Sequence, residues 1–192
     1  GQVDIDAISE TRAAATAMTS YEYSFVTIGN LDATAATINR AEAYVKNATV
    51  KVTGNASIDS ATYGIASALC EAPGGFGVAS IHKAKARAFV GTPHSHDLSG
   101  DEEDDMDEDA LDFAEPLTSN AYVSAATIEA GGNITIKAYN QGQGKSEVKK
   151  GTTATITKIS TSLIPTYSIY ETTAKVTGNG KLIAGGSISI TA

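Results

Sequence analysis

A short phrase occurs four times along this chain: a glycine, then alternating apolar and polar residues that end in Ala or Ser. The four copies occupy positions 1–7, 54–60, 132–138 and 186–192. The middle interval is longer than its neighbours by about 24 residues, and it holds an acidic tract of similar length, roughly residues 92–117. If that tract is an insertion, the chain has a repeat of about 54 residues. A fixed period of this kind is typical of stacked, quasi-one-dimensional folds.

The composition points to an all-β stack. Aromatic residues make up 6% of the chain, Trp is absent and there are 18 glycines, whereas Ala, Thr, Ser, Ile and Val are abundant. Thr, Ile and Val favour pleated strands, and small residues let layers pack closely. Gly and Asn tolerate positive φ and therefore suit the corners between strands.

Further short strands are expected upstream of each glycine phrase. Ala-Tyr-Val or Ala-Lys-Val segments at 43–45, 121–123 and 174–176 precede the phrase closely, and alternating segments follow at 49–52, 126–130 and 181–184. The alanine run at 13–15 taken alone could form a helix, but its place within a β repeat favours strand. Short strands between Gly and Asn corners suit coils of roughly 18–25 residues, which predicts about 8–10 coils in the chain. At one rung per coil, such a stack would be a rod on the order of 40–50 Å long, with open edges at both ends that favour end-to-end association.

The net charge of −8 is concentrated in one place. Residues 97–115 hold 11 of the 22 acidic residues and no Lys or Arg, so the remainder has 14 basic against 11 acidic residues, a net of +3. Nothing in this near-neutral scaffold suggests nucleic-acid binding, which would need a basic face. No apolar run reaches the length needed to span a membrane. The single cysteine, Cys70, is expected to be a small buried hydrophobe.

The acidic tract is the candidate metal site. Its carboxylates are hard oxygen ligands of the kind that Ca²⁺ prefers, and the candidate ligands are Asp101, Glu102, Asp104, Asp105, Asp107 and Asp109. Their spacing matches neither the twelve-residue calcium loop nor nonapeptide calcium repeats, and a solvated loop is the usual state of a like-charge block. A contact with a basic partner is the third alternative. His94 and His96, two apart, would share one face of a strand, as a metal pair requires.

Several segments resemble the repeats of large bacterial exoproteins. They are the long string at 121–138, which includes Ala-Gly-Gly-Asn-Ile-Thr-Ile, together with residues 64–68, 88–91 and 184–190. The resemblance is to leukotoxin-type and filamentous-haemagglutinin-like adhesins of Gram-negative bacteria. It implies a right-handed parallel β-helix, secretion by a two-partner or autotransporter-type route, and a rod at the cell surface. Because the chain begins and ends on copies of its own phrase, it is expected to be a single β-solenoid segment of a longer protein.

The expected function is therefore structural and adhesive. The segment would be extracellular or on the bacterial cell surface, where it would contribute to attachment or virulence through a receptor or glycan on a host or neighbouring cell. The alternative is a polysaccharide lyase or hydrolase, because parallel β-helices also host such enzymes, which need convergent acids and bases on one wall. Asp6 and Asp59 recur at the same phase of the repeat, which indicates an outward structural position. The sequence shows no catalytic set, so an enzyme is not expected.

Overall fold

The computed structural model describes residues 1–18, 22–23, 25–72, 75–91, 115–150, 154–164 and 166–192. In these residues the chain is all-β, without a helix, and its strands form four sheets with parallel pairing. Sheet A contains β1 (Val3–Met18), β6 (Ala56–Ala72), β10 (Ile134–Lys150) and β15 (Ile188–Thr191). Sheet B contains β2 (Glu22–Tyr23), β3 (Val26–Thr37), β7 (Gly75–Val90), β11 (Ala154–Leu163) and β12 (Thr166–Ser168). Sheet C contains β4 (Arg40–Lys46), β8 (Leu117–Ser124) and β13 (Tyr170–Thr177), and sheet D contains β5 (Thr49–Val52), β9 (Thr127–Ala130) and β14 (Lys181–Ala184).

One repeat makes one coil. Val3 lies opposite Ala56, Ala56 opposite Ile134, and Ile134 opposite Ile188. Each of these residues stands two positions after the glycine of its own phrase, so the pairing follows the spacing of the phrase. Between successive strands of sheet A, the chain passes through sheets B, C and D in turn. The glycine phrase is thus the same point of every coil, and the fold is a β-solenoid-like stack.

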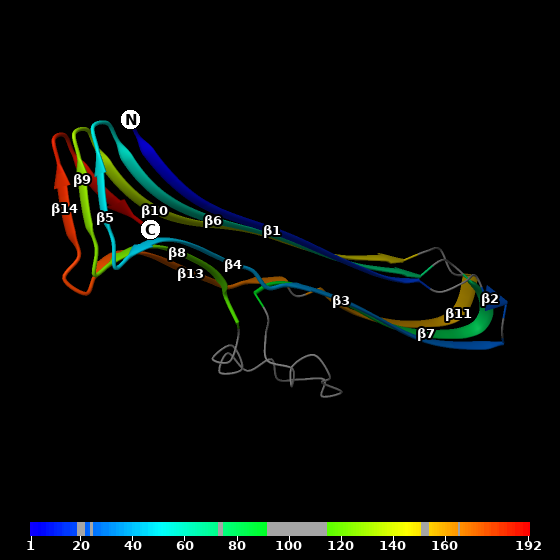
Figure 1. Cartoon of the computed structure of the whole chain (residues 1–192). Helices are drawn as coiled ribbons and strands as arrows, with labels where there is room; N and C mark the ends of the chain where they lie inside the picture. Colours follow the sequence, from blue (N-terminus) through cyan, green and yellow to red (C-terminus); the bar gives the residue numbers. More distant parts are fainter. Residues whose placement is uncertain (19–21, 24, 73–74, 92–114, 151–153, 165) are drawn as a thin grey trace.

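The prediction of coils of roughly 18–25 residues, and so of about 8–10 coils, is wrong. The small-residue stretch after each glycine phrase does not turn a corner but continues the same strand, so that β1 and β6 run for 16 and 17 residues. The predicted strand at the alanine run is confirmed. The predicted rod is also wrong for this chain, because four strands of sheet A rise only about 14 Å along the stack while β6 extends about 55 Å across it. Figure 1 shows these long strands of sheet A above those of sheets B and C, with sheet D closing one end.

The pairing also locates the additional residues of the long interval. Thr37 pairs with Val90 and Arg40 pairs with Thr118, so that the short step from Thr37 to Arg40 in the first coil corresponds to the whole segment from Val90 to Thr118 in the second. The additional residues therefore enter between sheets B and C. Residues 92–114 lie outside the described part of the chain, so that an acidic loop there stays a prediction. Leu117, at the end of the predicted insertion, is instead the fully buried first residue of β8.

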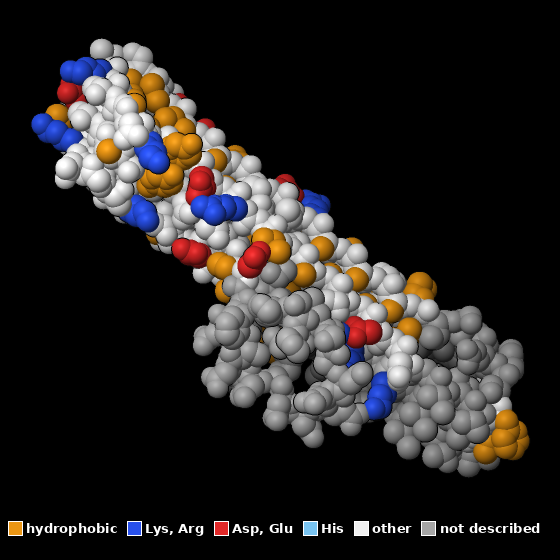
Figure 2. Space-filling view, turned by 60° about the horizontal axis from the view of Figure 1, so that its bottom comes forward, with side chains coloured by type: hydrophobic (Ala, Val, Ile, Leu, Met, Phe, Trp, Pro, Cys, Tyr) orange, Lys and Arg blue, Asp and Glu red, His pale blue; other side chains and the backbone are white. Residues whose placement is uncertain are grey.

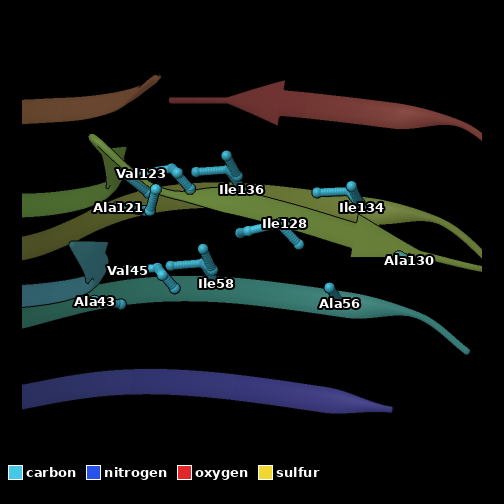
Figure 3. Packing of buried hydrophobic residues seen from close by; sticks show 12 residues of the cluster. Ala43, Val45, Ala56, Ile58, Ala121, Val123, Ile128, Ala130, Ile134 and Ile136 are labelled. Atoms are coloured by element: carbon cyan, nitrogen blue, oxygen red, sulfur yellow. The ribbon is translucent and has the colours of Figure 1, made fainter. Parts of the chain in front are cut away.

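The wider half of the coil, where sheets A, C and D enclose the interior, has a core of branched residues. Ile5, Ile58, Ile136 and Ile190 lie in register on successive strands of sheet A. Ile136 is fully buried, whereas Ile190 in the last strand is 45% exposed. Figure 3 shows the side chains from β4, β6, β8, β9 and β10 that gather in this cluster. A single coil cannot bury its own inner face, and it needs a coil on each side.

The narrower half of the coil, between sheets A and B, has a core lined mainly by alanine. Its buried members are Leu31, Ala33, Ala35, Ala66, Ala68, Cys70, Ala84, Ala86, Ala88, Val90 and Leu117. Small side chains let two sheets approach more closely than the usual face-to-face separation. This narrow interior explains why the chain is rich in alanine and poor in aromatic residues. The prediction for Cys70 is confirmed, since it is fully buried and its Sγ lies 3.0 Å from the Lys85 carbonyl oxygen, and burial raises the pKa of its thiol.

A polar seam separates these two cores; we define it as Ser60, Thr62, Ser119 and Asn140. Ser119 Oγ donates to Ser60 Oγ at 2.9 Å, and Ser60 Oγ donates to the Ala41 carbonyl at 2.9 Å. The Asn140 amide donates to two more carbonyls of sheet C strands, those of Leu117 at 3.0 Å and Glu171 at 2.7 Å. Ala41 and Leu117 are buried, and buried carbonyls need such partners. The seam supplies them where the wall of the coil changes from sheet B to sheet C.

The glycine phrase begins at the corner between sheets D and A, where the backbone leaves no room for a side chain between adjacent coils. A Cβ on Gly131 would lie 2.3 Å from the Thr53 carbonyl oxygen, and one on Gly132 would lie 2.2 Å from Asn55 Oδ1. That Asn55 oxygen accepts a hydrogen bond from the Asn133 backbone N–H at 2.9 Å, and Asn133 Oδ1 accepts one in turn from the Ser187 N–H at 2.9 Å. Glycine is thus needed here for close contact between coils. The prediction that positive φ explains the corner glycines does not apply to these positions.

Positive φ does occur at the corner between sheets C and D. Asn47, Ala125 and Gly178 have φ of 51°, 48° and 61°. They occupy the same phase, because the Asn47 N–H donates to Ser124 O and the Ala125 N–H donates to Thr177 O. Asn and Gly tolerate this conformation, whereas alanine is strained in it.

Gly131→Ala should destabilise the fold by about 1–3 kcal/mol, because its methyl group would overlap the backbone of the preceding coil. Gly1→Ala is the matched control, since a Cβ there meets nothing within 4 Å and its stability should not change. Thermal or urea unfolding of both variants measures the difference. Equal stability of the two would contradict the close-contact explanation.

Ala125→Gly should stabilise the fold by about 0.5–1 kcal/mol, because glycine relieves the left-handed strain at φ 48°. The neighbouring Ala126→Gly is the control. Ala126 is buried and its φ is not positive, so this variant should lose about 1 kcal/mol. Melting temperatures that move in the same direction for both variants would show that the corner is not strained.

Candidate functional site

The candidate calcium ligands Asp101, Glu102, Asp104, Asp105, Asp107 and Asp109 all lie outside the described residues, as do His94 and His96. The calcium site therefore stays a prediction of the sequence. In the part of the chain that the structure describes, no group of three or more His, Cys, Asp or Glu side chains is arranged to hold a metal ion. Asp6 and Asp59 lie opposite each other in register and point outward, which confirms the interpretation of their common phase.

Each of the three arginines is paired with a carboxylate. Arg12 lies 2.7 Å from Glu10, Arg40 contacts Glu42, and Arg87 lies 2.5 Å from Asp32. The hydrogen bond from Arg40 is the main cause that lowers the pKa of Glu42, and the same bond raises the pKa of Arg40. A general acid needs a raised carboxyl pKa, and Glu42 is shifted in the opposite direction.

A hollow of about 280 Å³ lies on the outward face of sheet A. We call it the sheet A hollow, and its lining residues are Glu10, Tyr63, Gly64, Ile65, Gln141, Gly142 and Gln143. They come from three successive coils, because Glu10, Tyr63 and Gln141 lie opposite one another on β1, β6 and β10. Glu10 is the single carboxylate of this lining, and it accepts hydrogen bonds from Arg12 at 2.9 and 2.7 Å.

Tyr63 lines the hollow, and a second tyrosine, Tyr139, lies beside the hollow in contact with Tyr63 and Gln141. The Tyr63 and Tyr139 rings lie 6.1 Å apart between centroids at an interplanar angle of 58°, and Tyr139 is 42% exposed. The Tyr139 hydroxyl donates to Gln141 Oε1 at 3.2 Å, and Lys137 Nζ lies 5.9 Å from the centroid of the Tyr139 ring. The hollow and its margin thus combine two aromatic rings with the primary amides of Gln141 and Gln143.

A second aromatic pair lies on sheet C. The Tyr44 and Tyr122 rings stack with centroids 5.1 Å apart and planes 9° from parallel, and burial is the first cause that raises the pKa of Tyr122. These residues are in register on β4 and β8. Stacked pairs of this kind contribute about 0.5–1.5 kcal/mol beyond their buried area, so the pair is best explained as a contact between coils. In Figure 2, acidic and basic side chains of the described residues are scattered along the face that is shown, and neither charge forms a continuous patch there.

A further hollow of about 320 Å³ lies over sheet D, lined by Lys51, Val52, Thr53, Glu129, Ala130, Gly131 and Ile183. Its two charged residues neutralise each other, since Lys51 Nζ lies 2.8 Å from Glu129 Oε2. Neither hollow was predicted from the sequence. The signal for the sheet A hollow was available in the repeat itself, because aligning 54–72 with 132–150 brings Tyr63 opposite Gln141.

Among the described residues there is no helix of the length and apolarity that crossing a bilayer requires. Comparison of the chain with protein-family models, with curated proteins and with solved structures gave no match.

Proposed function

We propose that this chain is a structural and adhesive segment of a secreted or cell-surface filamentous exoprotein of bacteria, in which stacked coils support attachment or fibre formation. The observation that carries the proposal is the in-register stacking of four copies of one phrase in sheet A. A stack of this type is extended by adding coils, because each coil contacts only its neighbours. The sequence resemblance to adhesin repeats agrees with this use.

The finer architecture is part of the same proposal. We take the coils to turn in the right-handed sense that strongly predominates for connections between parallel strands. The residues between Val90 and Thr118 would project from the stack as an acidic loop, and that loop would hold Ca²⁺ weakly if its carboxylates converge. The alternative of a polysaccharide-active enzyme stays a prediction of the sequence, and no described contact favours it.

The open edge of the first coil supports self-association of this chain. Among the described strands, β1, β3, β4 and β5 each pair with a strand of the second coil alone, so that their other edge is open. Apolar residues that point into the interior, such as Ile5 and Ala7, are only half-buried there. Open parallel edges above half-covered apolar residues are the features that favour addition of another strand. The partner that we propose for this edge is a second copy of the chain.

Ala14→Pro should weaken self-association and leave the fold intact. Val3 N–H donates to Asn55 O, so the odd-numbered residues of β1 bond to β6 and the even-numbered ones face the open edge. Proline at Ala14 therefore removes a donor from the open edge alone, whereas Ala15→Pro, the control, removes a hydrogen bond to β6 and should lower the melting temperature. Sedimentation velocity over a concentration series measures association. Identical profiles for the parent chain and Ala14→Pro would exclude this edge.

Beads coated with the chain should be retained on cultured epithelial cells or on bacterial layers several-fold better than beads coated with Ile58→Asp. Ile58 is 1% exposed, and a buried charge at this position should unfold the stack. Circular dichroism of both proteins checks the folded state. Equal retention of folded and unfolded chains on every surface would contradict an adhesive function.

A further inference from the structure

We infer that the sheet A hollow is a binding site for a neutral saccharide, and this inference rests on the proposed function because it names the kind of ligand that an attachment segment would hold. The hollow lies in the middle of the outward face of β1, β6 and β10. Its lining side chains come together only when the coils stack, because three different coils supply them.

Two glycines in register form the floor of the hollow. Gly64 and Gly142 lie opposite each other on β6 and β10, where a Cβ would come within 2.8 Å of Leu117 Cδ2 and 2.4 Å of Val90 Cγ1, respectively. At this point the side chains of Leu117 and Val90 therefore lie directly against the backbone of sheet A. Figure 1 shows the two walls of the coil approaching each other along this stretch. The hollow lies on the outer side of this stretch, between the outward side chains that flank the two glycines.

The aromatic rings suit the apolar face of a sugar. Tyr63 and Tyr139 are tilted by 58°, so that the two rings form an angled surface rather than a closed stack, and Tyr139 is 42% exposed. The C–H groups on one face of a pyranose ring are weakly positive and pack favourably on the negative face of an aromatic ring. Aromatic rings with a few placed polar groups are the usual composition of a small-molecule site.

The polar groups of the hollow suit hydroxyl groups without net charge. Gln141 and Gln143 each carry an amide that both donates and accepts, which matches sugar hydroxyls. Tyr139 fixes the position of Gln141 through its hydrogen bond of 3.2 Å. The Glu10 carboxylate is neutralised by Arg12, with its two contacts of 2.9 and 2.7 Å. The lining has no unpaired charge that would favour an acidic or basic ligand.

Titration of the full chain with cellohexaose, maltohexaose and mannohexaose, followed by calorimetry and by the NMR signals of the tyrosine rings, tests the inference. At least one hexaose should bind in the micromolar to millimolar range. Tyr139→Ala should weaken that binding about tenfold, while Tyr139→Phe should retain most of it because the ring remains. Tyr44→Ala, which removes a tyrosine from sheet C, is the matched control and should bind as the parent does. Melting curves confirm that each variant is folded.

Three results would overturn the inference: none of the three hexaoses binds, Tyr139→Ala binds as tightly as the parent chain, or Tyr44→Ala weakens binding as much as Tyr139→Ala does. Stronger binding of oligogalacturonate than of every neutral hexaose would also contradict it, because the lining has no surplus of positive charge. The bead experiment separates failure of the saccharide site from failure of the proposed adhesive function. Beads that attach to cells although no hexaose binds would leave the adhesive function standing and remove the saccharide site.

Discussion

The parallel backbone ladder between residues one repeat apart is the interaction on which this structure depends. In sheet A it joins β1, β6, β10 and β15 in one continuous register, and parallel pairing between successive coils recurs in sheets B, C and D. Because the ladder holds each residue above its counterpart, identical side chains stack, as Ile5, Ile58, Ile136 and Ile190 do. It also brings together residues that the sequence separates by a whole repeat, and the sheet A hollow is the result.

The interior dimensions then decide which residues are permitted along the coil. Where sheets A, C and D enclose a wider space, Ile and Val fill it, and where sheets A and B lie close together, alanine and Cys70 line the gap. The polar seam lies between these halves, at the level where the additional residues of the second coil enter. An insertion at that point leaves the ladder undisturbed, because pairing resumes at Thr118 with the residues that follow it in phase. A protein of this design can therefore add a segment between two sheets without changing its core.

The phase of the repeat could be predicted from the sequence, because the alternation after each glycine marks the same inward residues, and sheets A, C and D follow from it. The length of a coil could not. The repeat favours strand for the stretch from Ser9 to Ala17, but only its pairing with Thr62 to Cys70 shows that it continues the strand of the glycine phrase without a corner. Ala125 has no sequence signal for positive φ, since its conformation is imposed by a corner that Asn47 and Gly178 favour. The hollow escaped prediction because Glu10, Tyr63 and Gln141 come together only when one repeat makes one coil, and the length of the coil was predicted wrongly.

The central claim is that each copy of the repeat makes one complete coil, and a distance between the first and last strands of sheet A tests it most directly. Asp4, Ser57, Thr135 and Ser189 lie in one row, and both end members are exposed. Spin labels on cysteines at Asp4 and Ser189 should be separated by three rungs, a backbone distance of about 14 Å. Coils of about 22 residues would place the two positions about seven rungs apart, at about 35 Å, and that distance measured by double electron–electron resonance would contradict the account.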